Sequence, residues 1–242
     1  MRVRQRHQRL RFVGFVVGLC TLGVSAPGLE FTVALDTAPL IGHPAGPFSL
    51  DFQLIDGSGM GDSNNTAIVT NFNFDGGSAA STPVLTGGAS GNLSSGITLA
   101  ESSFFNDCHE QFSSGSNLTF TVQLTTNLQT PQPDEFSFAI LDSGGNEIPT
   151  TGPADALLIV AINSVDPAVQ TFSTDPSIPP VAGGLGIDIP AAMISIIPEP
   201  STLAIVVVGL AALLVGQPRR AVDHPTAILR RRNQQTGPLF PS

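Results

Sequence analysis

Two segments of the chain alternate apolar and polar residues without interruption, and this pattern is the strongest constraint on the fold. They are Phe48-Ser-Leu-Asp-Phe-Gln-Leu54 and Leu118-Thr-Phe-Thr-Val-Gln-Leu124. Successive side chains of a β-strand point to opposite faces of a sheet, so a period of two places one face in a core and the other in water. The alternation therefore predicts strands that are covered on one face only.

Further strands are predicted along the same stretch of chain. The period of two recurs in Ile68–Phe74 and Phe136–Phe138, and other candidates are Leu29–Leu35, Gly96–Phe105, Leu157–Ile162 and Gly186–Ile197. Turn-forming residues are concentrated between them, at Asp56–Asn65, Gly76–Ser81, Gly87–Ser95, Asp142–Asn146 and Ser173–Gly184. About eight strands separated by such turns indicate an all-β fold, an antiparallel β-sandwich of the jelly-roll type, with a small barrel as the alternative.

The first 26 residues have the organisation of a signal peptide. A basic segment with five arginines, the last at Arg11, precedes the apolar segment Phe12–Val24. Val24-Ser25-Ala26 then resembles a cleavage site with small residues at the two critical positions. Cys20 is not expected to carry a lipid, because Leu19 is too large for the position before a lipidated cysteine. Residues 1–26 are therefore predicted to form a signal helix that directs export.

The C-terminal region has three parts in a fixed order. Pro198-Glu199-Pro200 is followed by an apolar run from Leu203 to Gly216 and then by Arg219 and Arg220. Residues 201–216 carry no charge and would form a helix of roughly 24 Å, somewhat shorter than a bilayer core. The arginines fit a cytoplasmic stop. We expect a transmembrane helix over about 201–217 and a disordered basic tail over 221–242; the alternative is a buried helix or strand of a soluble domain.

Charge is segregated along the chain. All ten basic residues are arginines, and all ten lie outside residues 27–197, whereas eighteen of the nineteen acidic residues lie between Glu30 and Glu199. Residues 27–197 therefore form one acidic extracellular domain in which no lysine or arginine can pair with a carboxylate. Binding to nucleic acid is not expected, because attraction to phosphate requires cationic side chains. The carboxylates must instead be solvated, hydrogen-bonded or bound to cations.

The order of parts in the C-terminal region resembles the PEP-CTERM sorting signal of Gram-negative bacteria. The resemblance implies that an exosortase-type membrane protease recognises residues 198–220 and removes the anchor. Three further segments are similar to a group of PEP-CTERM ectodomains to which no activity is generally assigned. They are Phe52-Gln-Leu-Ile-Asp-Gly-Ser-Gly59, Asn71-Phe-Asn-Phe-Asp-Gly-Gly77 and the segment from Pro133 to Thr151. The continuation of the chain past Arg220 departs from the usual pattern of such tails.

The loop from Asp56 to Asn65 is a candidate Ca²⁺ site. Asp56 and Asp62 offer carboxylate oxygens on a flexible Gly/Ser segment, which suits Ca²⁺. The loop lacks the spacing and the terminal glutamate of an EF-hand, and the alternative is an ordinary polar hairpin loop. Asp142, with Asn146 and Glu147, is a weaker case of the same kind.

Asn106-Asp107-Cys108-His109-Glu110 is the densest group of reactive side chains. We interpret it as a surface turn, with a metal contact and catalysis as the alternatives. Cys108 and His109 would point to opposite faces of a strand, which argues against a catalytic dyad. Once Cys20 leaves with the signal peptide, Cys108 has no partner for an intramolecular disulfide.

Two classes of function follow from these features. The first is an exported, non-enzymatic protein of the cell surface or extracellular matrix that associates with cell-surface polysaccharide. The PEP-CTERM resemblance implies the setting, a bacterium that makes exopolysaccharide and lives in flocs or biofilms. The second is a secreted carbohydrate-binding or Ca²⁺-dependent adhesion domain, and, less favoured, a hydrolase. Trp and Tyr are absent, which removes the usual platforms for stacking sugars, and no pair of carboxylates is singled out for glycoside hydrolysis.

Overall fold

The computed structural model describes residues 28–127, 132–162, 167–178 and 185–198. The chain divides into two units, residues 1–199 and 200–242, and all described residues belong to the first. The predicted signal helix (1–26), the predicted transmembrane helix (about 201–217) and the predicted basic tail (221–242) lie outside them. Within the described residues, no helix is both long and apolar enough to cross a membrane.

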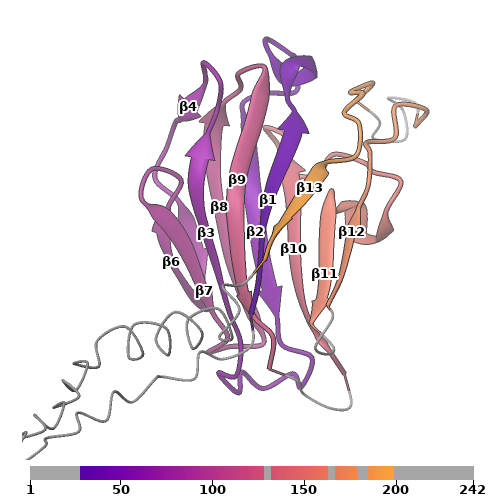
Figure 1. Ribbon diagram of the computed structural model, residues 1–242. Coiled ribbons are helices and arrows are strands. Elements are labelled where there is room, and N and C mark those ends of the chain that lie inside the picture. Colours follow the sequence, from indigo (N-terminus) through magenta and orange to yellow (C-terminus); the bar gives the residue numbers. More distant parts are fainter. Residues whose placement is uncertain (1–27, 128–131, 163–166, 179–184, 199–242) are drawn as a thin grey trace, which may run out of the picture. The chain divides into compact units, whose positions relative to one another are not determined.

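The described residues form an all-β, sandwich-like fold of two antiparallel sheets (Figure 1). The six-stranded sheet has the order β13 (Met193–Ile197), β1 (Gly28–Asp36), β9 (Asn117–Thr125), β3 (Thr66–Asn73), β7 (Gly96–Ala100) and β6 (Gly88–Asn92). The seven-stranded sheet has the order β12 (Ala168–Thr171), β11 (Leu158–Ile162), β10 (Asp134–Leu141), β2 (Phe48–Ile55), β8 (Phe105–Ser113) and β4 (Ser78–Ala79), and β5 (Val84–Thr86) also pairs with β8. Two short 3-10 helices, Ala38–Leu40 and Pro153–Asp155, complete the described elements.

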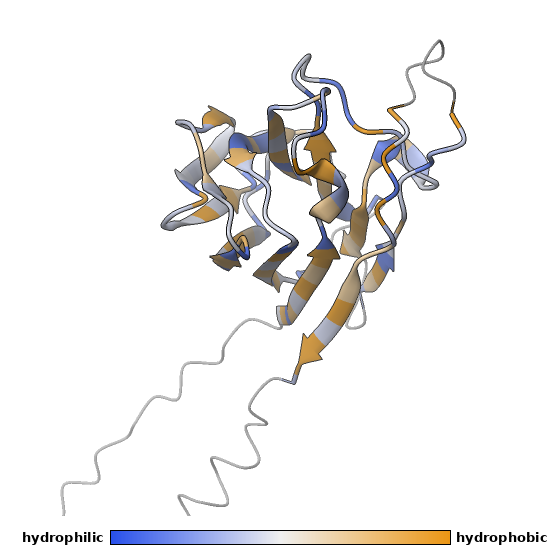
Figure 2. Ribbon diagram, turned by 90° about the horizontal axis from the view of Figure 1, so that it is seen from above, coloured by the Kyte–Doolittle hydropathy of each residue, from blue (hydrophilic) through white to orange (hydrophobic). Residues whose placement is uncertain are grey.

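The core between the sheets is built from the apolar positions of the alternating segments. Phe52 on β2 stacks on Phe138 of β10 at a centroid distance of 5.0 Å. Phe120 on β9 meets both rings edge-on, at 5.4 Å and 5.1 Å, and so joins the two sheets. Such edge-to-face pairs add to the stabilisation from burial alone. Viewed along the strands, hydrophobic and hydrophilic residues alternate in bands on the ribbons (Figure 2).

Most of the strands predicted from alternation are confirmed. Leu29–Leu35, Phe48–Leu54, Leu118–Leu124 and Phe136–Phe138 lie in β1, β2, β9 and β10, while Leu157–Ile162 and Ile68–Phe74 largely coincide with β11 and β3. The turn at Asp142–Asn146 is also confirmed, since Gly145 N donates to Asp142 O. After this turn the chain forms an isolated bridge between Leu141 and Glu147.

Several predicted strands and turns are wrong; the turn-rich segment Gly76–Ser81, for example, contains β4. The single strand over Gly96–Phe105 is two strands in different sheets, because β7 ends at Ala100 and β8 begins at Phe105. The turn-rich segment Gly87–Ser95 contains β6. Only the last five residues of Gly186–Ile197 form a strand, β13.

The loop between Asp56 and Asn65 is not a hairpin loop. It connects β2 to β3, which belong to different sheets, so it crosses one end of the sandwich.

The antiparallel register pairs Gly28 with Thr125 and Glu30 with Ile197. The start of β1 and the end of β13 therefore lie side by side at one end of the domain.

Candidate functional site

Two groups of clustered ionisable side chains, among them five buried carboxylates, stand out among the described residues. The first contains Asp56, Glu101 and Asp134, and the second contains Asp51, Asp107 and His109. In each group the candidate ligand atoms all lie within 4.8 Å of one another. Burying several carboxylates together is costly unless they are protonated, hydrogen-bonded or paired with a cation. We call them the end cluster and the face cluster.

The end cluster is assembled from three chain connections at one end of the sandwich. Asp56 directly follows β2, Glu101 directly follows β7, and Asp134 is the first residue of β10. Strands β2 and β10 belong to the seven-stranded sheet, whereas β7 belongs to the six-stranded sheet. The cluster thus links the two layers, and all three side chains are completely buried.

Hydrogen bonds satisfy most of the carboxylate oxygens in the end cluster. Asp56 accepts bonds from Ser58 N at 2.5 Å, Ser58 Oγ at 2.9 Å and Met60 N at 3.1 Å, and from Gly61 N. Burial alone would raise the pKa of Asp56, but these bonds together lower it below its usual value. Asp56 is therefore ionised at neutral pH.

Asn65 orients the other two carboxylates of the end cluster. Its Nδ2 donates to Asp134 Oδ2 at 2.6 Å, and its backbone N donates to Glu101 Oε2 at 3.2 Å. Asp134 Oδ1 accepts a further bond from Gly57 N at 2.8 Å. Glu101 Oε1 is buried and has no hydrogen-bond partner among the described residues. Burial raises the pKa of Glu101 to about 8, and the charge of Asp134 adds to the shift.

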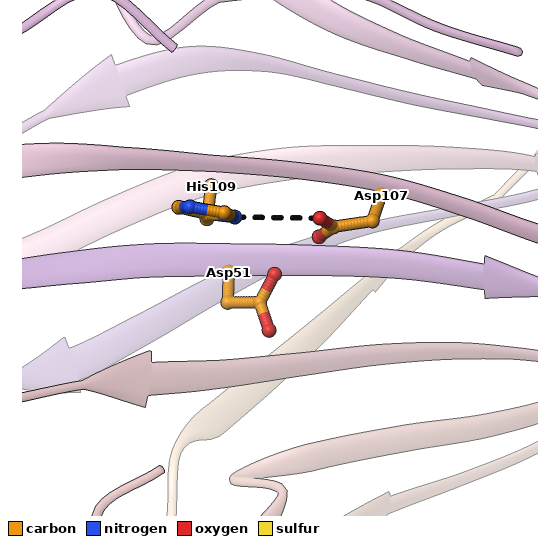
Figure 3. A group of neighbouring side chains, drawn as sticks. All are labelled: Asp51, Asp107 and His109. Carbon is orange, nitrogen blue, oxygen red and sulfur yellow. Dashed lines mark hydrogen bonds and ion pairs between the residues drawn. The ribbon is translucent and has the colours of Figure 1, made fainter. Parts of the chain in front are cut away.

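The face cluster lies on the outer face of the seven-stranded sheet (Figure 3). In the pairing of β2 with β8, Asp51 is opposite His109 and Phe52 is opposite Cys108. Phe52 and Cys108 are both fully buried in the core, so their neighbours in the chain face outward. His109 Nδ1 lies 3.3 Å from Asp107 Oδ2.

Among the described residues, Asp51 Oδ1 and Asp107 Oδ1 of the face cluster are buried without a hydrogen-bond partner. Burial raises the pKa of Asp51 to about 8, and the nearby Asp107 adds to the shift. Burial also raises the pKa of Asp107. Two such carboxyl groups beside a histidine provide the groups needed for proton transfer or for a mixed oxygen and nitrogen metal site. A pocket of about 350 Å³ adjoins the cluster and includes Ser49, Ser81, Thr82, His109, Gln111 and Asp142 in its lining.

The surface turn predicted over residues 106–110 is wrong, because this segment is the middle of strand β8. Its inward-facing polar residues are hydrogen-bonded to backbone. Asn106 Nδ2 donates to Leu54 O and Ser103 O, and its Oδ1 accepts from Gly88 N. Glu110 Oε2 accepts from Leu93 N. These bonds allow a polar segment to form a strand. The alternation of apolar and polar residues alone could not indicate this.

Cys108 and His109 point to opposite faces of β8, as the spacing predicts. Cys108 is a free, buried thiol. Burial raises its pKa to about 12, with smaller contributions from the neighbouring carboxylates. It is therefore not an activated nucleophile.

The two predicted Ca²⁺ ligands are placed differently. Asp56 belongs to the buried end cluster, whereas Asp62 is exposed and accepts a hydrogen bond from Asn64 N. In an exposed turn, Asp142 Oδ1 accepts hydrogen bonds from the backbone N of Gly144 and of Asn146. Pro198 is the last described residue, and Glu199, Pro200, Arg219 and Arg220 lie outside the described residues.

Sequence reasoning missed Glu101, Asp134 and Asp51, and it included Asn65 only as the last residue of the candidate loop. The sequence does show that the acids of the end cluster lie next to predicted strands. It does not show the strand order, which is what brings these strand ends together.

Comparisons with protein-family models, curated proteins and solved structures found no match for this chain.

Proposed function

We propose that this protein is exported to the cell surface or extracellular matrix, where it acts without catalysis. An exosortase-type membrane protease sorts it through the Pro198-Glu199-Pro200 signal, and the apolar segment with Arg219 and Arg220 holds the precursor in the membrane. The support in the sequence is the order of the three C-terminal parts and the exclusion of every arginine from residues 27–197. The expected setting is a Gram-negative bacterium that produces extracellular polysaccharide.

The observation that carries the proposal is the pairing of the first strand with the last. β1 begins two residues after the predicted signal peptide, and β13 ends one residue before the predicted sorting motif. Because Glu30 is opposite Ile197, the chain enters and leaves the domain at the same end. This arrangement would let the predicted signal peptide and the predicted sorting signal reach the same membrane from one end of the domain.

We assign the sandwich to the jelly-roll type within this proposal. Support comes from the way the chain alternates between the layers. β1, β3, β7 and β9 lie in the six-stranded sheet, and β2, β4, β8 and β10 lie in the seven-stranded sheet. Repeated crossing between two antiparallel sheets is typical of jelly rolls. Such domains serve many functions, so the fold itself indicates no activity.

Fractionation of the native host tests the sorting proposal. The unaltered protein is expected in the cell-surface or extracellular fraction, and deletion of Pro198–Pro200 is expected to retain it in the membrane fraction. The chain contains a matched control, Pro131-Gln132-Pro133, in which changing both prolines to alanine should leave the location unchanged. Identical fractions with and without Pro198–Pro200 would refute the proposal.

A second candidate function is saccharide binding on the outer face of the seven-stranded sheet. The observation in its favour is the pocket beside His109, whose lining includes hydroxyl groups of Ser49, Ser81 and Thr82, the amide of Gln111 and the carboxylate of Asp142. Full-length protein applied to a glycan array should then bind, and Gln111→Ala should weaken binding. Turnover of a bound glycan that is lost in Asp51→Asn would instead favour a hydrolase.

A further inference from the structure

The end cluster has no protein cation to balance its charge. Asp56, Glu101 and Asp134 are fully buried, and residues 27–197 contain no lysine or arginine. The two histidines in this span are His43 and His109. His109 lies against Asp107 in the face cluster, and the Nδ1 of His43 accepts a bond from Ala45 N in its own loop.

One oxygen of the end cluster lacks a partner in the part of the chain that the structure describes. Amide and hydroxyl groups bond to both oxygens of Asp56, both oxygens of Asp134 and Oε2 of Glu101. Glu101 Oε1 is buried and unpartnered within the group. A buried carboxylate oxygen without a donor is destabilising, and a bound cation would provide its partner. This observation points to a ligand independently of the number of acids.

The donor set indicates the class of cation. The three side chains supply only carboxylate oxygens, which suit hard cations such as Ca²⁺ and Mg²⁺ and not those that prefer nitrogen or sulfur. Mg²⁺ demands near-ideal octahedral geometry and usually keeps several waters, whereas Ca²⁺ accepts irregular sets of carboxylate oxygens. Three fully buried carboxylates from separate strand ends therefore favour Ca²⁺.

We propose that Asp56, Glu101 and Asp134 bind one Ca²⁺ ion at the end of the sandwich where the chain enters and leaves. The ion would join the end of β2 and the start of β10 in one sheet to the end of β7 in the other. Asn65 is a positioning residue, because it holds Asp134 and Glu101 through two hydrogen bonds. Asp62, exposed in the same loop, extends the negative field toward solvent. The proposal is independent of the sorting signal.

Calorimetric titration of the full-length protein in nonionic detergent, after removal of metals with a chelator, tests the site. The result expected is one Ca²⁺ bound per chain, a higher melting temperature with millimolar Ca²⁺ and no such rise with Mg²⁺. Glu101→Gln keeps the shape of the side chain but removes its charge, and it should weaken Ca²⁺ binding at least about tenfold. Asp188→Asn removes an exposed carboxylate that belongs to neither cluster and should leave Ca²⁺ binding unchanged, and Asp51→Asn tests whether the face cluster binds the ion instead.

Folding of the variants is checked by circular dichroism without metal, and Asp134→Asn serves if Glu101→Gln does not fold. Absence of Ca²⁺ binding by the unaltered protein would overturn the proposal. So would equal Ca²⁺ affinity in the unaltered protein and in the folded end-cluster variant. Loss of Ca²⁺ binding in Asp51→Asn, with retention in the end-cluster variant, would move the site to the face cluster and also overturn it.

Discussion

The buried carboxylates should make the metal-free protein lose stability as the pH rises from 5 to 8, the opposite of ordinary acid denaturation. Glu101 has an ordinary pKa of 4.5 and a pKa of about 8 in the folded protein. Between these values the folded state keeps a proton that the unfolded state has released. The contribution of Glu101 is therefore fully present below pH 4.5 and is lost as the pH rises toward 8.

The magnitude follows from the linkage relation. When the folded state binds one proton more than the unfolded state, the unfolding free energy falls by about 1.4 kcal/mol for each unit of rising pH. Between pH 5 and 7.5 the fall is about 3 kcal/mol. Asp51 acts in the same direction, because its pKa rises from 3.8 to about 8 on folding. Asp56 has a lowered pKa in the folded protein, and its ordinary pKa is 3.8. It therefore changes the unfolding free energy only at a pH near or below 3.8, which lies outside the interval from pH 5 to 7.5.

Urea unfolding of the full-length protein in detergent and chelator, followed by far-ultraviolet circular dichroism at several pH values, measures this loss. Fluorescence is unsuitable because the chain has no Trp or Tyr. Glu101→Gln should reduce the loss by about 1.4 kcal/mol per pH unit in the same interval. Unfolding free energy that rises from pH 5 to 8, or an identical slope in Glu101→Gln, would refute the reasoning.

Three further predictions concern the core and strand β8. Phe52→Ala should lower the unfolding free energy by about 3–5 kcal/mol in urea titrations, whereas Phe104→Ala, at an exposed ring, should change it by less than about 0.5 kcal/mol. Asn106→Ala should cost about 2 kcal/mol or more by leaving Gly88 N and Leu54 O without their partner, while Gln111→Ala on the exposed side of the same strand should have little effect. Cys108 should resist alkylation at pH 7 until urea unfolds the protein, as mass shifts would report; modification of the native thiol would contradict its burial.

The strands that were predictable from sequence share one property. In β2 and β9 every inward position is apolar, so the period of two is visible and the core residues can be named in advance. Strand β8 breaks this rule because its inward positions include Asn106 and Glu110, whose hydrogen bonds come from residues distant in sequence. A pattern based on hydrophobicity cannot detect a polar position that the tertiary structure satisfies.

The candidate sites were less predictable than the strands. Asp56 could be selected from its loop, but its partners Glu101 and Asp134 lie 45 and 78 positions further along the chain. They meet only because β2, β7 and β10 have their ends at one edge of the sandwich. Asp51 was similarly hidden within an alternating strand, where it had the appearance of a solvated polar position.

Intact mass spectrometry of the protein isolated from its native host tests the central claim, export followed by removal of the anchor, most directly. The account predicts a chain that begins close to residue 27 and ends close to Pro198–Pro200, with any covalent attachment visible as added mass at that end. A mass corresponding to all 242 residues, or to a chain that still contains the segment from Leu203 to Arg220, would contradict it.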